Sequence, residues 1–213
     1  MRFDAAVSRL TAPDRFVGPL PVGPEALIPA LADPRLRPRL EPTGREREAA
    51  VLVLLFPDAG GDARLVLTER LTYEGYHSGE VSFPGGKAEP DDADIVATAL
   101  REAAEEVALD PETAGVSILG RLDDVLIPVS AFRISPVVAV ADRAPRLVAN
   151  PTEVARILEP PVAAFLPSAA VEIVERQIGD WLLRYGGYRI DGLHVWGATG
   201  RILGQLGAIL ADA

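Results

Sequence analysis

The chain has 213 residues, a formal net charge of -10 and no cysteine. This length suits one domain, or one domain with an appended segment, and 48% apolar with 24% charged residues is ordinary for a globular protein. The negative charge disfavours nucleic acid and anionic membranes as partners. The absence of cysteine excludes disulfides, a thiol nucleophile and cysteine-ligated zinc. Neither a signal-peptide core nor an apolar run near the roughly 20 residues of a membrane span is found, so we expect a cytoplasmic protein.

The first 45 residues differ from the rest of the chain because they are rich in proline. Two short helices are predicted there, at Ala5–Leu10 and Glu25–Leu31, and the prolines between them exclude a long regular element. We therefore predict an N-terminal extension, residues 1–45, packed on a main domain of residues 46–213.

The main domain is predicted to begin with two strands and a long loop. The apolar run Ala49–Phe56 and the alternating run Arg64–Arg70 flank a turn-rich Gly/Asp cluster, which favours a β-hairpin or adjacent strands. Leu71–Gly86 is predicted as a loop. Asp92–Leu109 shows helical spacing of apolar residues, with Asp91 or Asp92 as the N-cap.

The remaining elements alternate between strands and helices. A central mixed β-sheet with helices on both faces, in the mixed α/β or α+β class, fits this pattern best. The later elements are strands at Val116–Leu122, Arg133–Ala141, Val171–Glu175 and Trp181–Tyr188, a short helix at Thr152–Leu158 and a final helix at Gly197–Leu210.

Three acidic residues of the predicted helix, Glu102, Glu105 and Glu106, project from one face because they are three and four positions apart. Their mutual repulsion, with no lysine among them, indicates either a solvated acidic face or a site for a divalent cation. Mg²⁺ and Mn²⁺ prefer such carboxylate oxygens. Arg101 can orient one carboxylate, and Gly85 and Gly86 allow the backbone to approach a ligand closely.

The segment from Gly86 through Arg101-Glu102-Ala-Ala-Glu105-Glu106-Val resembles the Nudix box. The resemblance implies a Nudix-like α/β/α sandwich with a central mixed β-sheet, and a metal-dependent hydrolase that acts on phosphoric anhydride bonds. It also implies that Arg101, Glu102, Glu105 and Glu106 are catalytic, that the three glutamates bind Mg²⁺ or Mn²⁺, and that the carbonyl near Gly85 is a further ligand. Here the spacing from Gly86 to Arg101 is one residue longer than usual, and Ala108 stands where the box has its last glycine.

A longer stretch is similar to the coenzyme A pyrophosphatase branch of that family. The similarity rests on Leu67–Arg70 and on His77–Gly86, together with Pro128–Phe132, Ile134–Val138 and Val195–Thr199. It implies hydrolysis of the diphosphate of coenzyme A or its derivatives to 3',5'-ADP and 4'-phosphopantetheine. Where the branch has a small residue and an arginine, this chain has Leu71 and Gly75, which keeps open another substrate of the family, such as ADP-ribose, a dinucleotide or a damaged nucleotide. A noncatalytic domain that binds a nucleotide as a sensor is a separate alternative. A homodimer is also compatible with the resemblance.

Five residues outside the glutamate cluster are candidates with two interpretations each. Asp92 is either a helix cap or a supporting ionic partner of the box arginine, at the place of the usual first glutamate. His77 and Arg70 are candidates for substrate binding, although the first also suits a structural hydrogen bond and the second an ion pair with box carboxylates. Glu80 is either a contact of metal or substrate or a turn cap, and Glu153 is either a supporting catalytic carboxylate or the start of a helix. Gly86 completes the predicted substrate-binding set.

Overall fold

The computed structural model describes residues 1–31, 44–71, 79–127, 131–178 and 181–212. Its central feature is a six-stranded mixed sheet in which β2 (Arg47–Pro57) and β9 (Phe132–Ala141) pair in parallel. The other pairs are antiparallel: β3 (Ala63–Leu65) and β6 (Gly85–Lys87) flank β2, whereas β7 (Val116–Arg121) and β8 (Val125–Ile127) flank β9. The predicted central mixed sheet is therefore confirmed.

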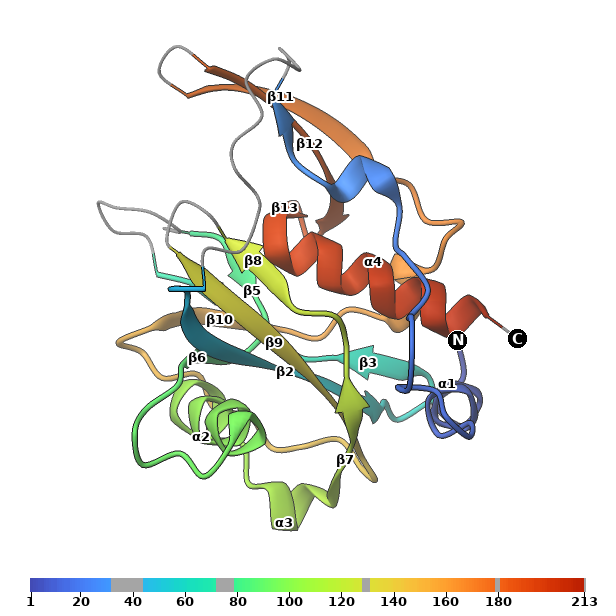
Figure 1. Cartoon of the computed structure of the whole chain (residues 1–213). Helices are drawn as coiled ribbons and strands as arrows, with labels where there is room; N and C mark the ends of the chain where they lie inside the picture. Colours follow the sequence, from blue (N-terminus) through green and yellow to red (C-terminus); the bar gives the residue numbers. More distant parts are fainter. Residues whose placement is uncertain (32–43, 72–78, 128–130, 179–180, 213) are drawn as a thin grey trace.

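Helices cover both faces of this sheet (Figure 1). Side chains alternate along β2, so that Ala50, Leu52 and Leu54 pack against α2 (Ile95–Val107), while Val51, Val53 and Leu55 face α4 (Gly197–Ala211). All six of these side chains are buried. Such a strand is apolar throughout because both of its faces lie in a core. The predicted α/β/α sandwich is confirmed.

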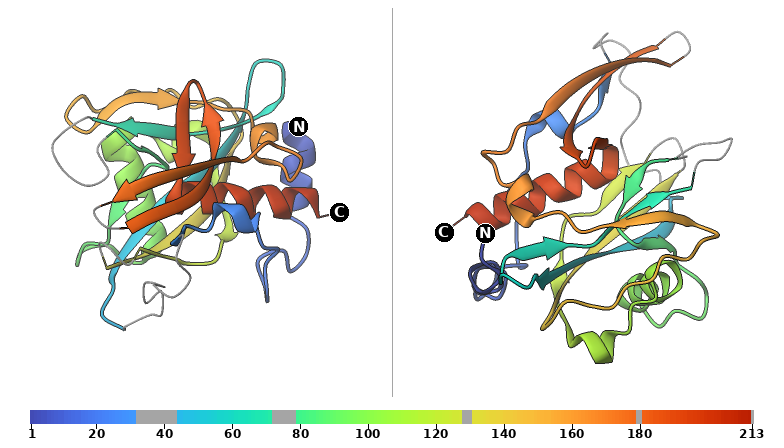
Figure 2. Two further views of the ribbon diagram at one scale, coloured as in Figure 1. Left: turned by 90° about the horizontal axis from the view of Figure 1, so that it is seen from above. Right: turned by 180° about the vertical axis from the view of Figure 1, so that it is seen from behind.

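A second sheet stands on the far side of α4 from the central sheet (Figure 2). Its long strand β12 (Trp181–Ile190) pairs with β11 (Glu172–Ile178), with β13 (Leu193–Trp196) and with the short β1 (Ala30–Leu31). Tyr188 and Val195 of this sheet are buried in the same core as α4. The 3-10 turn η3 (Val162–Phe165) closes the core, where the rings of Phe165 and Tyr188 meet edge to face at 5.1 Å.

The third sheet is small and carries residues of the candidate site. In it β4 (Leu67–Arg70) lies between β10 (Val154–Leu158) and β5 (Val81–Ser82), and both pairs are antiparallel. The N-terminal residues share the core of the main domain, since Ala6 and Leu10 of α1 (Phe3–Leu10) and Leu27 of η1 (Glu25–Leu27) belong to its buried cluster. Helix α3 (Pro111–Ala114) follows α2 directly. None of the described helices is long and apolar enough to cross a membrane.

Several predicted elements were wrong in type or extent. The helix predicted at Thr152–Leu158 is strand β10, because its main chain pairs with β4 after a single turn at Asn150. The helix predicted at Glu25–Leu31 stops after one 3-10 turn, and the run Arg64–Arg70 divides into β3 and β4 at Val66. The predicted loop contains β5 and the start of β6, and strands β8 and β13 were not predicted.

Candidate functional site

Helix α2 begins at a side-chain cap and ends at a residue in the left-handed conformation. Asp94 is the N-cap residue, and its side chain accepts a hydrogen bond of 2.8 Å from the backbone N–H of Ala97. The predicted caps Asp91 and Asp92 are therefore wrong. At the C-terminus Ala108 adopts a left-handed conformation, φ 53° and ψ 34°, which a glycine adopts with less strain. The Nudix box, which this segment resembles, has its last glycine at this position.

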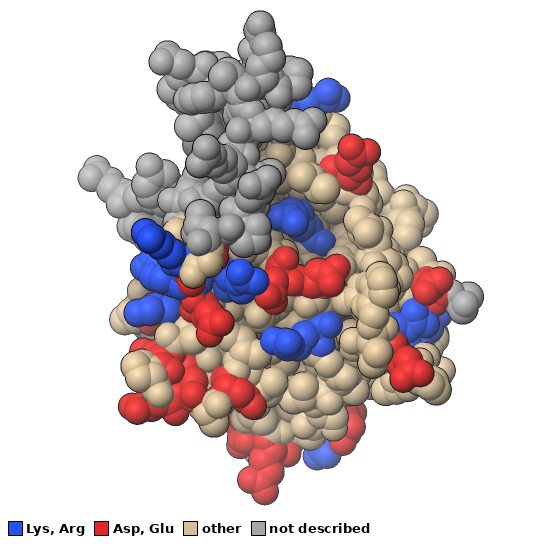
Figure 3. All heavy atoms as spheres, in the orientation of Figure 1, with Lys and Arg blue, Asp and Glu red and all other residues tan. Residues whose placement is uncertain are grey.

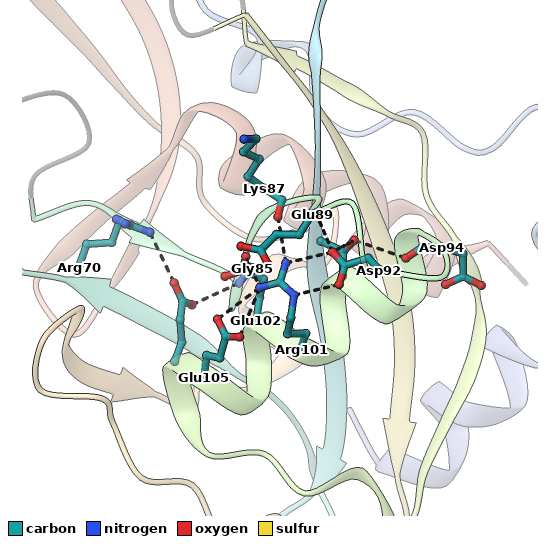
Figure 4. A network of polar contacts seen from close by, with 11 residues as sticks. Arg70, Gly85, Lys87, Glu89, Asp92, Asp94, Arg101, Glu102 and Glu105 are labelled. Carbon is teal, nitrogen blue, oxygen red and sulfur yellow. Dashed lines mark hydrogen bonds and ion pairs between the residues drawn. The ribbon is translucent and has the colours of Figure 1, made fainter.

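Arg101 is the centre of a polar network that joins α2 to the segment before it (Figure 4). Its Nε and Nη2 donate to the two carboxylate oxygens of Asp92 at 2.9 and 3.0 Å. Its Nη1 donates to Glu102 at 3.0 Å and to Glu105 at 3.3 Å, and its Nη2 also donates to the carbonyl of Lys87 at 3.0 Å. The two-pronged ion pair holds the pKa of Asp92 well below its usual range. Asp92 thus positions the guanidinium that contacts two of the three glutamates.

The three glutamates of α2 differ in environment. Glu106 is 2% exposed, and burial raises its pKa to about 7 against the opposing effects of the Gly85 N–H and Arg70. Burial likewise raises the pKa of Glu102, whereas the Glu105 side chain remains 54% exposed. The negative charge of Glu153 raises the pKa of both Glu102 and Glu106. The carboxylate of Glu153, in the turn before β10, therefore repels those of Glu102 and Glu106 on α2, and a cation would relieve this repulsion.

The glycine pair on β6 provides the space for two of these carboxylates. The backbone N–H of Gly85 donates to Glu106 at 3.2 Å. A Cβ atom at Gly86 would lie 2.5 Å from the carboxylate atoms of Glu102, so this side chain occupies the place that a larger residue would fill. A Cβ atom at Gly85 would lie 2.3 Å from the carbonyl oxygen of Ala50 on β2. Each glycine is thus required by a close approach, the first to backbone and the second to a carboxylate.

Strands β4 and β10 bring further predicted residues to the cluster. Arg70 Nη1 lies 3.6 Å from Glu106 Oε1, and the buried Nε of Arg70 finds no hydrogen-bond partner among the described residues. The Arg70 N–H donates to the carbonyl of Glu80, and the carbonyl of Glu153 accepts from Leu71. The structure therefore brings Arg70 and Glu153 near the glutamates of α2, whereas Glu80 is tied by its carbonyl to the main chain of Arg70. His77 lies outside the described residues.

Lys87 is a residue of this site that the sequence reasoning missed. It is the only lysine of the chain, and it follows the glycine pair directly. Its carbonyl fixes Arg101, while its side chain is exposed and extends away from the carboxylates (Figure 4). Because the contact is made by a main-chain carbonyl, the residue type at position 87 carries no signal of it in the sequence.

The residues of this cluster fit a hard divalent cation by their chemistry. The donors are the carboxylate oxygens of Glu102, Glu105 and Glu106, with Glu153 nearby, and oxygen is the ligand that Mg²⁺ and Mn²⁺ prefer. As the side chains stand in the described part of the chain, no three acidic or histidine side chains are gathered closely enough to hold an ion. Arg101, Arg70 and the Gly85 N–H hold these carboxylates instead. A bound ion would compete with them.

Charged side chains of both signs lie near one another on one face of the described surface. Acidic and basic side chains alternate over the face shown in Figure 3. A cavity of about 330 Å³ beyond the N-terminus of α2 is lined by both kinds, among them Glu48, Arg121 and Arg133. Arg133 lies 3.6 Å from Asp124, which accepts a hydrogen bond of 2.7 Å from Ser135. This cavity is separate from the glutamate cluster.

Fold and site together define a protein of the Nudix class. The NUDIX domain model matches residues 46–175, more than half of the chain, and the chain therefore belongs to the Nudix family, which acts on phosphoric anhydride bonds. The family in general uses divalent metal ions.

The similar proteins carry the same family name. Nudix hydrolase 15, mitochondrial, of Arabidopsis thaliana is 37% identical over 186 residues, which are 84% of this chain and 61% of the relative. The uncharacterized Nudix hydrolase NudL of Pectobacterium atrosepticum is 37% identical over 180 residues, 84% of this chain and 90% of the relative. The chain thus spans about three fifths of the plant relative. The crystal structure of a MutT protein from Methanosarcina mazei Go1 matches with a TM-score of 0.50 at 14% identity, over 79% of this chain and 99% of that one, which supports the fold alone.

Proposed function

We propose that this chain hydrolyses the diphosphate of a nucleoside diphosphate derivative in a reaction that depends on Mg²⁺ or Mn²⁺. The observation that carries the proposal is that Glu102 and Glu106 meet the glycine pair of β6 beside Arg70, while Arg101 joins Glu102 to Glu105. Substrate phosphate and these carboxylates are both negative, so cations must lie between them. Glu102, Glu105, Glu106 and the carbonyl near Gly85 are the proposed metal ligands.

The residues of the chain supply positioning and charge. A bound divalent ion supplies polarisation of phosphoryl oxygens and a more acidic water molecule. Arg70 has an unsatisfied Nε and binds a phosphate oxygen in place of its long contact with Glu106. One carboxylate of the cluster accepts the proton of the attacking water, and Glu105 and Glu153 are among the candidates. Arg101, held by Asp92, keeps Glu102 and Glu105 in place.

Coenzyme A or a derivative is the substrate that we propose in particular. The support is the similarity of Leu67–Arg70 and His77–Gly86 to the coenzyme A pyrophosphatase branch. The products would be 3',5'-ADP and 4'-phosphopantetheine. ADP-ribose is the second candidate, because Leu71 and Gly75 replace the residues usual in that branch.

A substrate panel tests the proposal. Coenzyme A, acyl-coenzyme A, ADP-ribose and NADH are incubated with the protein and Mg²⁺ or Mn²⁺, and the products are separated by chromatography. We expect cleavage between the two phosphorus atoms, loss of turnover with EDTA, and its return when the ion is restored. A reaction in ¹⁸O-labelled water should place one labelled oxygen on a phosphate of one product, as attack of water on phosphorus requires.

Matched variants separate catalysis from general damage. Glu105→Gln should abolish turnover, while Glu112→Gln, on the exposed side of α3, should leave it unchanged. Tight binding of coenzyme A or ADP-ribose without turnover of any substrate would overturn the proposal and identify a nucleotide sensor instead.

A further inference from the structure

Three aromatic side chains gather on one face of the second sheet, and none of them has a role in the proposed hydrolysis. The rings of Tyr185 on β12 and Trp196 on β13 lie 4.3 Å apart between centroids with planes at 31°. The ring of His194 lies 5.7 Å from Tyr185 and fills the space above Gly187, where a Cβ atom would lie 2.6 Å from its Nε2. The cluster is thus fixed by stacking and by the pairing of β13 with β12.

The cluster faces away from the hydrophobic core of its sheet. Alternation along β13 points Leu193 and Val195 into the core that contains α4, whereas His194 and Trp196 project from the other face. Tyr185 is buried at 5% exposure, but Trp196 remains partly exposed. The indole of Trp196 therefore packs against the buried ring of Tyr185, and part of the indole surface is open to solvent.

Strand order brings this indole near the glutamate cluster. Strand β13 lies against β5, with Cα atoms of the two strands within 8 Å of each other, and it leads directly into α4 (Figure 1). Strand β5 pairs with β4, about 5 Å away by ordinary strand spacing, and β4 ends at Arg70. The strands that carry Trp196 and Arg70 are thus linked through β5 by two steps between Cα atoms, one of up to 8 Å and one of about 5 Å. An extended nucleotide covers this distance.

We propose that Trp196 is the platform on which the nucleobase of the substrate stacks while the diphosphate lies at the glutamate cluster. This inference rests on the proposed hydrolysis of a nucleoside diphosphate derivative and adds its base-binding residue. An uncharged aromatic face binds a base without regard to the sign of the surrounding charge, which suits a chain with a net charge of -10. Because Tyr185 and the strand pairing already hold the indole, little conformational entropy is lost on binding.

Tryptophan fluorescence tests the stacking directly. The chain has two tryptophans, so a Trp181→Phe background leaves Trp196 as the single reporter. In this background we expect adenosine 5'-monophosphate with Mg²⁺ to quench the emission, and ribose 5-phosphate, which has the same phosphate and sugar without a base, to leave it unchanged. Equal quenching by the two compounds, or quenching by neither, overturns the proposal.

Kinetics on the panel's best substrate then distinguishes binding from structural support. Trp196→Leu should raise KM about 10-fold, the size of one base–aromatic stack, and change kcat less than 2-fold. Trp196→Phe should have a KM close to the wild-type value. Trp181→Leu, the matched control, should leave KM unchanged. A parallel fall of kcat and melting temperature in Trp196→Leu without a KM change would overturn the inference. Turnover of Trp196→Leu with the wild-type KM would contradict the stacking role but not the proposed hydrolysis. Absence of turnover in the wild-type protein would contradict the proposed hydrolysis itself.

Discussion

The two glycines of β6 predict opposite consequences for the same substitution. A Cβ atom at Gly86 would lie 2.5 Å from the carboxylate of Glu102, the end of a flexible side chain that can move aside. An ordinary contact is about 3.5 Å, so the carboxylate must shift by on the order of 1 Å, a misplacement that can cost about 100-fold in rate. A Cβ atom at Gly85 would instead meet the carbonyl oxygen of Ala50 at 2.3 Å and the Cα of Val51 at 2.6 Å. These backbone atoms belong to the central strand and cannot move aside.

The expected results therefore separate activity from stability. Gly86→Ala should lower kcat/KM about 100-fold and leave the melting temperature nearly unchanged, because alanine also loses less entropy than glycine on folding. Gly85→Ala should destabilise the fold by about 1–3 kcal/mol or more, a fall in melting temperature of roughly 3 °C per kcal/mol for a chain of this size. Steady-state kinetics and calorimetry on both variants measure the contrast. Wild-type kcat/KM in Gly86→Ala, or equal melting temperatures in the two variants, would refute the reasoning.

Three further predictions concern stability. Ala108→Gly should raise the free energy of unfolding by about 0.5–1 kcal/mol, seen as a higher urea midpoint, because the left-handed conformation strains alanine more than the flexibility of glycine costs. A lower midpoint would contradict this. Asp92→Asn should lower the urea midpoint at pH 7, and since the pKa of Asp92 is depressed in the folded state, the difference from wild type should shrink as pH falls below about 4. A difference that stays constant down to pH 2 would exclude this origin. Tyr188→Phe should stabilise the protein by about 1 kcal/mol in calorimetry, since its buried hydroxyl has no hydrogen-bond partner among the described residues; a loss of stability would reveal one.

The regular elements with clear periodicity could be predicted from the sequence. Helix α2 has apolar residues at helical spacing, and strands β2 and β9 each contain a continuous apolar run, so the type of each was correct. Strand β10 was mistaken for a helix because Val154 and Leu158 are four residues apart, as on a helical face, while its strand character comes from pairing with β4 far along the chain. Tertiary pairing of this kind leaves little local signal.

The candidate site shows the same division between local and distant information. The spacing of Glu102, Glu105 and Glu106 places them on neighbouring turns of one helix, and the structure has them there. The role of Asp92 required its position relative to Arg101, nine residues away through a loop whose course no periodicity describes. The different burial of the three glutamates depends on β6 and β4, which the sequence does not place beside the helix.

The apolar character of β2 on both faces has a consequence for how the sheet finds its alignment. Ala49 to Phe56 are all buried, so sliding this strand by one position along its parallel neighbour would exchange one set of aliphatic side chains for another of similar size. Hydrophobicity alone therefore discriminates poorly between the two alignments. The contact of Gly85 with the Ala50 carbonyl and the hydrogen bond of Gly85 to Glu106 occur in only one of them. Gly85, whose N–H donates to Glu106 at the site, thus also selects the native registration of the central sheet.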